Sequence, residues 1–170
     1  WLLANGIDIA RMNAVRKHCS AVTGGRLAAR LVGRPAAALV VSDVPGDDLA
    51  VIGSGPTVAD PTTYADALAL VDAVRDHADP LDRGRLLALR ANLLSALGDR
   101  STIDAYREAL SVAGEPDRPL LRARMAQSAV MEGDLDTAVA VLDGLEPDGG
   151  PADVPILLAR GNLAYFTGDI

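Results

Sequence analysis

LRARMAQSAVMEGDLDTAVAVL, residues 121–142, contains two apolar runs at helical spacing on either side of the pair Gly133-Asp134. The same pair recurs at residues 98–99 and 168–169, so that its three copies stand 35 residues apart. A small residue lies seven positions before each glycine, where two helices would have to approach closely: Ala91, Ala126 and Gly161. The pattern predicts successive pairs of helices, each with a Gly-Asp turn.

This period resembles that of the tetratricopeptide repeat family, in which each unit is a helix, a turn and a second helix. The resemblance covers residues 82–170, with one residue deleted between Asp99 and Ala105 and a third repeat that stops at Ile170. It implies a groove that holds a peptide or a partner protein, and no chemistry. We expect all-α tetratricopeptide-like helical hairpins over residues 82–170.

The composition excludes several classes of protein. The 170 residues are 49% apolar and 23% charged, as in a globular protein. No uncharged run is long enough for a membrane span and no signal peptide is evident, so we expect a cytoplasmic protein with no membrane partner. A net charge of −7 and an aromatic content of 3% argue against a nucleic-acid partner. The single cysteine, Cys19, excludes an internal disulfide framework.

The sequence pattern changes near Pro80. Before it, short segments are separated by glycine and proline, and after it, long stretches have helical spacing. We therefore expect two domains, residues 1–78 and residues 82–170. Residues 1–40 hold six basic residues against one acid, whereas residues 41–78 hold seven aspartates against one arginine. Such a basic segment followed by an acidic one could serve a phosphate group and its metal ion.

The basic segment contains two candidate binding elements. Asp8 can cap a helix on which four polar residues share one face: Asn13, Arg16, Lys17 and Ser20. The pair Gly24-Gly25 stands directly before a second helical stretch, where free backbone N–H groups can bind an anion. A simple turn or cap is the alternative interpretation of a glycine pair.

The acidic segment begins with PAAALVV, residues 35–41, an uncharged run that predicts a strand buried on both faces of a parallel sheet. Ligands bind at the carboxyl end of such strands, so Asp43, Asp47 and Asp48 are candidates to hold a divalent cation, with a solvated loop as the alternative. The loop Gly53–Thr57 could bring backbone amides against a substrate, and residues 60–63 start a helix over residues 64–76.

Four blocks in this order resemble the glycerate 2-kinase family, also called the MOFRL or hydroxypyruvate-reductase-like glycerate kinases. The blocks are NAVRKHCS (13–20), GGRLA (24–28), SDVPGD (42–47) and SGPTVADPTT (54–63). The resemblance covers residues 1–77. It implies an α/β partial Rossmann-like layer and the ATP-dependent, Mg²⁺-assisted transfer of a phosphoryl group to the 2-hydroxyl of D-glycerate, across a cleft from a second domain.

The resemblance and the residue types together give the expected site. We expect catalytic roles for Lys17, Arg16 and Asp43, and a metal site at Asp43 and Asp47. Substrate or phosphate binding is expected at Asn13, Ser20, Gly24, Gly25, Ser54 and Gly55. Thr23 stands where the family commonly has lysine, so a phosphate contact made by that lysine is either lost or supplied by another residue.

Three interpretations follow. The chain begins with Trp1 and lacks the family's nucleotide loop and C-terminal domain, which favours a kinase fragment that is inactive alone. The 35-residue period favours instead a tetratricopeptide-like protein-binding module with a degenerate N-terminal domain. An artefactual fusion of two reading frames would explain both the missing methionine and the interrupted repeat.

Overall fold

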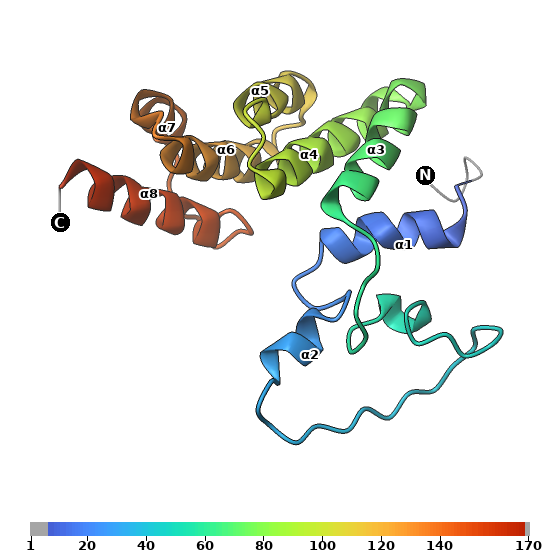
Figure 1. Ribbon diagram of the computed structural model, residues 1–170. Coiled ribbons are helices and arrows are strands. Elements are labelled where there is room, and N and C mark those ends of the chain that lie inside the picture. Colours follow the sequence, from blue (N-terminus) through green and yellow to red (C-terminus); the bar gives the residue numbers. More distant parts are fainter. Residues whose placement is uncertain (1–6, 169–170) are drawn as a thin grey trace. The chain divides into compact units, whose positions relative to one another are not determined.

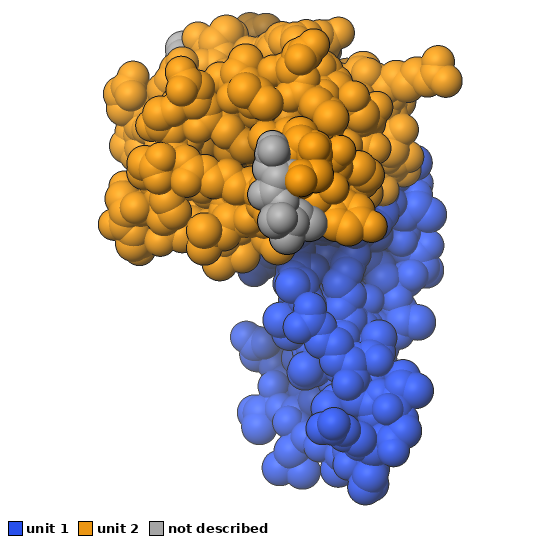
Figure 2. Space-filling view, turned by 90° about the vertical axis from the view of Figure 1, so that its left-hand side faces the viewer, with its two compact units in different colours: residues 1–74 blue, residues 75–170 orange. Residues whose placement is uncertain are grey.

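The computed structural model describes residues 7–168 and divides the chain into two compact units, Trp1–Val74 (unit 1) and Arg75–Ile170 (unit 2), coloured separately in Figure 2. Every regular element among the described residues is a helix (Figure 1). None of the described helices is long and apolar enough to cross a membrane. The sequence predicts a domain boundary between residues 78 and 82. The two units of the structure divide a few residues earlier, between Val74 and Arg75.

Unit 1 is built on the contact between two helices. Its elements are α1 (Ile9–His18), α2 (Arg26–Arg30), the 3₁₀ turn η2 (Ile52–Ser54) and α3 (Tyr64–Val74). The Asp8 side chain caps α1 as predicted, by accepting from the backbone N–H of Arg11 at 2.9 Å. Helices α1 and α3 contact each other and supply the buried apolar residues of this unit: Ala14, Val15, Ala67, Leu70 and Val71.

The expected α/β layer in residues 1–78 is wrong, because the described residues of unit 1 contain no strand. Residues 35–43 are extended but pair with no neighbouring segment. Leu39 and Val41 are 101% and 95% exposed. A strand buried on both faces needs partner strands and covering helices, and the described part of the chain supplies neither. Asp43 therefore does not stand at a sheet edge.

The described residues of unit 2 form one 3₁₀ turn followed by five helices. They are η3 (Arg75–His77), α4 (Pro80–Leu97), α5 (Thr102–Val112), α6 (Arg118–Glu132), α7 (Leu135–Leu142) and α8 (Asp153–Thr167). Helix α4 packs on α5, and α6 packs on α7 and α8. Ala91 and Ala126, two of the predicted close-approach residues, are fully buried, whereas Gly161 on α8 is exposed.

At residues 98–99 and 133–134 the repeated Gly-Asp pair ends one helix and turns the chain toward the next, whereas Asp169 of the third pair lies outside the described residues. Gly98, Gly133 and Gly168 each follow a helix with a left-handed backbone, at φ values of +66°, +81° and +79°. The N–H of Asp134 donates to the carbonyl of Ala129 at 2.8 Å, which satisfies a carbonyl at the end of α6. The Asp134 side chain then caps α7 by accepting from the N–H of Thr137. One dipeptide thus closes one helix and opens another.

Gly133→Ala tests this role of the glycine. The left-handed φ is unfavourable for a residue with a Cβ, so we expect a loss of about 1 kcal/mol of stability. Gly84→Ala is the matched control, because Gly84 lies inside α4 and its added Cβ would meet atoms no nearer than 3.6 Å. We expect that control to gain about 0.5–1 kcal/mol. Thermal unfolding measures both, and equal effects would contradict the assignment.

Candidate functional site

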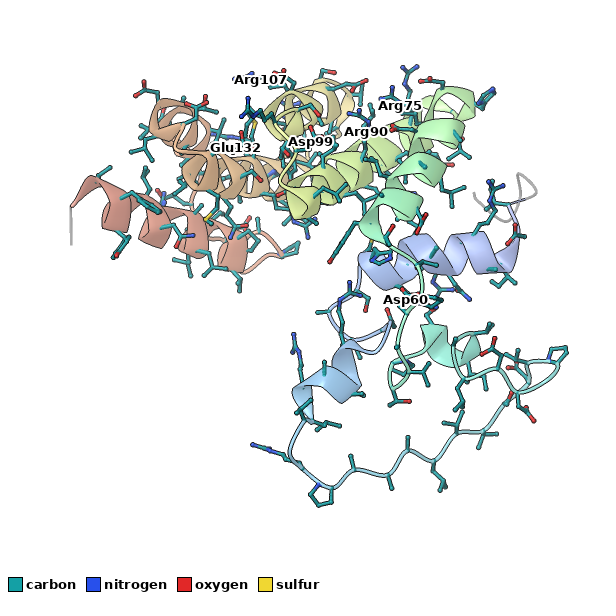
Figure 3. The ribbon with its side chains drawn as sticks, in the orientation of Figure 1. Asp60, Arg75, Arg90, Asp99, Arg107 and Glu132 are labelled. Atoms are coloured by element: carbon teal, nitrogen blue, oxygen red, sulfur yellow. The ribbon has the colours of Figure 1, made fainter. Side chains whose placement is uncertain are left out.

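Unit 1 contains a buried polar cluster that joins α1 to the segment leading into α3; it consists of Lys17, His18, Asp60 and Thr62. Lys17 Nζ lies 3.2 Å from Asp60 Oδ1, and each side chain is only 8% exposed. His18 Nε2 lies 3.1 Å from Thr62 Oγ1 and 3.6 Å from Asp60 Oδ2. Figure 3 labels Asp60 on the segment beside α1. The cluster connects residues more than 40 positions apart in sequence.

Asp60 is the acceptor at the centre of this cluster. Its Oδ1 accepts from the backbone N–H of Thr62 at 3.1 Å and from the Thr62 hydroxyl at 2.9 Å, in addition to Lys17. Burial raises the pKa of the carboxyl, but the hydrogen bonds from Thr62 and the ammonium of Lys17 outweigh it, so the pKa lies below its ordinary value. Asp60 is therefore held in its charged form.

This shift makes unit 1 sensitive to acid. The pKa of Asp60 is lower in the folded than in the unfolded chain, so the folded state binds fewer protons at moderately acidic pH. The resulting stability is present above the ordinary carboxyl pKa of about 4 and is lost as the pH falls through the lower, folded value. The free energy of unfolding, measured at intervals from about pH 6 down to about pH 3, should show this loss. Asp60→Asn should remove that part of the slope, and an unchanged slope would refute the assignment.

Three of the four blocks that carry the family resemblance meet in space around Ser54. The Ser54 hydroxyl donates to Asn13 Oδ1 at 3.3 Å, and both side chains are buried. The N–H of Gly24 donates to the carbonyl of Ser54 at 3.0 Å, and the N–H of Gly25 donates to the carbonyl of Gly55 at 2.8 Å. Five predicted binding residues from three sequence blocks (Asn13, Gly24, Gly25, Ser54 and Gly55) thus lie side by side.

The same contacts change the expected role of the glycine pair. The amides that the sequence offers to an anion are occupied by carbonyl oxygens of the 54–55 loop. A Cβ on Gly25 would lie 2.8 Å from the carbonyl oxygen of Val58, so glycine is needed for this close backbone approach. The following helix, α2, has only five residues. In this structure Gly24 and Gly25 serve as a backbone junction.

The remaining predicted residues lie apart from this junction. Arg16 is exposed on α1, and the Ser20 hydroxyl accepts from the backbone N–H groups of Val22 and Thr23. Asp43 is exposed at the end of the extended segment of residues 35–43, and Asp47 is exposed just after it, in a turn where it has a left-handed φ of 50°. Within residues 7–168, no group of three or more histidine, cysteine, aspartate or glutamate side chains could hold a metal ion.

Sequence reasoning missed Arg26 and Tyr64, which close the cluster on one side. The Arg26 guanidinium donates to the carbonyls of Lys17 and Thr23, and to the Tyr64 hydroxyl at 3.1 Å. The rings of His18 and Tyr64 lie 4.6 Å apart between centroids. Arg26 belongs to the GGRLA block and His18 to the NAVRKHCS block, whereas Tyr64 directly follows the SGPTVADPTT block. The blocks therefore include Arg26 and His18 but do not indicate that both contact Tyr64.

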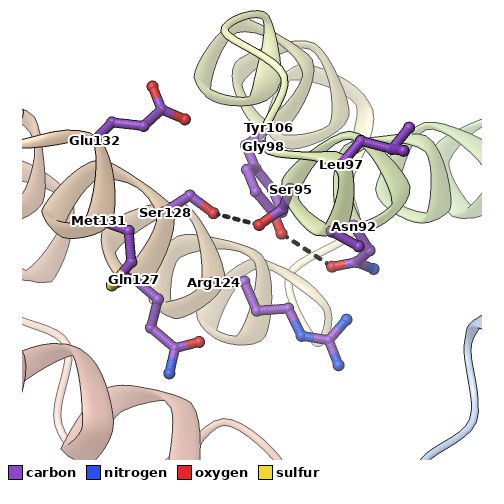
Figure 4. A pocket seen from close by; sticks show the side chains of 11 residues that line it. Asn92, Ser95, Leu97, Gly98, Tyr106, Arg124, Gln127, Ser128, Met131 and Glu132 are labelled. Atoms are coloured by element: carbon purple, nitrogen blue, oxygen red, sulfur yellow. Dashed lines mark hydrogen bonds between the residues drawn. The ribbon is translucent and has the colours of Figure 1, made fainter. Parts of the chain in front are cut away.

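Unit 2 has a separate pocket between α4, α5 and α6, with a volume of about 790 Å³ (Figure 4). Its lining includes apolar side chains, those of Ala96, Leu97 and Met131, and polar or charged ones, those of Asn92, Ser95, Tyr106, Arg124, Gln127, Ser128 and Glu132. The Tyr106 hydroxyl donates to Asn92 Oδ1 at 3.0 Å, and the Ser95 and Ser128 hydroxyls are 2.9 Å apart. Burial raises the pKa of Tyr106, so its hydroxyl stays protonated. The pocket can therefore donate hydrogen bonds to a ligand and accept hydrogen bonds from it.

Comparison with known proteins finds relatives of the N-terminal part of the chain. Residues 1–83 match the family described as Domain of unknown function (DUF4147). The chain is 57% identical over 70 residues to the "Putative hydroxypyruvate reductase" of Agrobacterium vitis. It is 49% identical over 71 residues both to the glycerate 2-kinase of Pyrococcus horikoshii and to the D-glycerate 2-kinase of Thermotoga maritima. No solved structure matches the chain.

These matches cover 41–42% of this chain but only 16–17% of the three relatives, so the chain spans less than one fifth of their length. The matched part contains the buried polar cluster and the junction around Ser54. The family match covers the whole of unit 1 and the first nine residues of unit 2.

Proposed function

We propose that unit 1 is part of a glycerate 2-kinase domain, which transfers a phosphoryl group from ATP to the 2-hydroxyl of D-glycerate. The observation that carries the proposal is that residues 49% identical to glycerate 2-kinases fold so that their separate blocks contact one another. Polar contacts join the 13–20, 24–28 and 54–63 blocks. Such buried polar contacts fix backbone positions, as a phosphoryl-transfer site requires.

The residues present fit the nucleotide and its metal ion in part. Mg²⁺ in nucleotide sites is commonly held by one or two carboxylates together with phosphate oxygens. Asp43 and Asp47 are exposed carboxylates of this kind, and we assign them to the ion. Bound Mg²⁺ would neutralise charge on the transferred phosphate. The glycine amides do not fit a phosphate here because they are engaged.

The cationic residues of α1 have different environments. Arg16 is exposed and can meet a phosphate directly, whereas Lys17 is paired with Asp60. We assign Arg16 to charge stabilisation and Lys17 to catalysis, with Asp60 fixing its position. Asn13, Ser20, Ser54 and Gly55 are assigned to holding the substrate or phosphate.

An exchange of segments between proteins tests the proposal. The 71 matching residues of the Thermotoga maritima kinase would be replaced by those of this chain, which supplies a complete protein around them. We expect this chimera to convert D-glycerate and ATP to phosphoglycerate and ADP in a coupled assay. The 170-residue chain alone should show no turnover above background, because both substrates must be held in register for transfer. A folded chimera without activity would refute the proposal.

The names of the relatives also include a reductase, so the same preparations are assayed with hydroxypyruvate and NADH. Hydride transfer needs a nicotinamide and no phosphoryl acceptor, so the two reactions separate cleanly. NADH oxidation without glycerate-dependent ADP formation would replace the kinase assignment by the reductase.

Unit 2 supports a second candidate function, which is to bind a peptide. The pocket of Figure 4 presents amide, hydroxyl and guanidinium groups that suit a peptide backbone. Peptides selected from a display library on the whole chain should lose affinity on Arg124→Ala and keep it on Arg83→Ala, a change outside the pocket. Equal losses would exclude the pocket as the binding site.

A further inference from the structure

A groove follows α4 and α6 of unit 2 and contains two adjoining pockets. The 790 Å³ pocket of Figure 4 is lined by the C-terminal halves of the two helices, and a second pocket of about 230 Å³ is lined by their N-terminal halves. Asn92 and Arg124 line both pockets, so the two cavities meet at these residues. The combined groove suits an elongated ligand.

One face of α6 supplies the charged side chains of the larger pocket. Its lining residues on α6 are Arg124, Gln127, Ser128, Met131 and Glu132, which have the spacing of a single helix face. Figure 4 shows Arg124 and Glu132 toward opposite ends of this row, with Ser128 between them. The eight residues from Arg124 to Glu132 correspond to about 12 Å along the helix axis. The groove therefore holds a cation and an anion at a fixed separation.

These two charges are not neutralised by the chain itself. Among the residues that the structure describes, none forms an ion pair with Arg124 or Glu132. By contrast, Arg118 and Arg122 on the same helix donate to the carbonyl oxygens of Leu110 and Val141. Arg124 is half-buried, and a buried donor without a partner is unfavourable. A ligand that brings an anionic acceptor to Arg124 would remove this cost.

The Glu132 end of the groove favours a positive group. Burial raises the pKa of the Glu132 carboxyl, and the nearby carboxylates of Asp134 and Asp99 raise it further. Helices α4 and α6 both end at this pocket, and the C-terminal end of a helix carries partial negative charge. A lysine or arginine side chain of a ligand would be stabilised by all of these groups.

The second pocket favours an apolar group. Aliphatic side chains make up about half of its lining: Ala88, Leu89, Val112, Leu120 and Leu121. Its charged lining residues other than Arg124 are Arg85 and Asp117, which are of opposite sign. Arg85 is already paired with Asp82 at 3.6 Å. A volume of about 230 Å³ accommodates one aliphatic side chain. From one end to the other, the groove thus offers an anion, a cation and an apolar cavity.

We propose that the groove binds an extended peptide whose basic side chain pairs with Glu132, whose acidic side chain pairs with Arg124 and whose apolar side chain enters the second pocket. The proposal rests on the peptide binding proposed for unit 2. In an extended chain, residues four positions apart point the same way and stand about 13 Å apart, close to the separation of the two charges. The apolar residue follows two positions beyond the acidic one, on the same side.

Defined peptides test this pattern on the whole chain. Two labelled nonapeptides with blocked termini carry lysine, glutamate and leucine at positions 2, 6 and 8, or at positions 8, 4 and 2, with serine elsewhere, so that both chain directions are represented. We expect one of them to bind in a fluorescence anisotropy titration. Exchanging its lysine and glutamate keeps the composition and the net charge, and should raise the dissociation constant at least about 10-fold.

Substitutions in the groove assign each contact. Arg124→Glu and Glu132→Lys should each raise the dissociation constant of the binding peptide at least about 5-fold. The double variant Arg124→Glu/Glu132→Lys should prefer the exchanged peptide, because both charges of the groove are then reversed. Asp136→Lys is the matched control: Asp136 is exposed on α7, lines neither pocket and gives the same change of net charge as Glu132→Lys. It should leave the affinity unchanged, and circular dichroism establishes that the variants keep their helices.

The outcomes separate this proposal from the peptide binding on which it rests. Equal affinity for the original and the exchanged peptide would overturn the charge pattern. Failure of both nonapeptides to bind, while library-selected peptides still bind and depend on Arg124, would also overturn the pattern but leave peptide binding in place. If no selected peptide binds, peptide binding by unit 2 is itself refuted.

Discussion

Asp60→Asn is expected to lower the free energy of unfolding of unit 1 by about 3–5 kcal/mol. The change keeps the size of the side chain and an oxygen that can accept from Thr62, but it removes the charge that balances Lys17. Lys17 is 8% exposed on its side chain, so its ammonium would stay buried without a counter-ion. An uncompensated buried charge is among the most destabilising changes a single substitution makes.

A double-mutant cycle separates the ion pair from other effects of the substitution. Lys17→Met removes the partner charge and keeps an unbranched side chain of similar length. The double variant Lys17→Met/Asp60→Asn should be more stable than the sum of the single effects by about 2 kcal/mol, because no charge is left unpaired. Hydrogen exchange of α1 and α3 during urea unfolding reports on unit 1, with α4 and α5 as internal reference. Additive effects would contradict a direct interaction.

Lys17→Ala in the chimeric kinase is expected to lower kcat/KM at least about 100-fold, because a positive group near the transferred phosphate stabilises developing charge. Asp43→Asn should also lower activity and raise the Mg²⁺ concentration needed for half-maximal rate. Arg34→Ala is the matched control, because Arg34 is exposed and the substitution removes one positive charge outside the proposed site.

The buried environment of Lys17 makes the comparison with Asp60 informative. If Lys17 acts on the phosphate, Lys17→Ala should reduce kcat more than Asp60→Asn does at equal thermal stability. If Lys17 only fixes the segment that leads into α3, the two variants should lose kcat in proportion to their stability. The second result would remove Lys17 from the catalytic set.

Features that depend on neighbouring residues could be predicted from the sequence. The Asp8 cap is a hydrogen bond from the N–H of Arg11, only three residues away in sequence. Helix α3 begins at the predicted Tyr64. The Gly-Asp turns are equally local, because a left-handed glycine ends a helix wherever the next residues permit it.

Features that depend on distant partners could not be predicted. Residues 35–41 have the composition of a buried strand, but a strand forms only where another strand accepts its hydrogen bonds. The bond from Lys17 to Asp60 spans 43 residues, and nothing in the local pattern of either residue names the other. Of the four polar residues predicted to share one helix face, Ser20 lies beyond the end of α1, Arg16 is exposed, and Asn13 and Lys17 are buried by contacts with other segments.

The exposed segment of residues 35–43 has a consequence for how the chain can be cut. Extended backbone without hydrogen-bonded neighbours fits the cleft of an endoprotease, and exposed aliphatic residues such as Leu39 supply a side chain for its specificity pocket. After cleavage there, the piece carrying α1 and α2 would still be tied to the remainder by the Lys17–Asp60 pair and by the backbone bonds from Gly24 and Gly25. Nicked halves would stay associated, which makes this segment the natural place to divide the gene for fragment complementation or to insert a reporter domain.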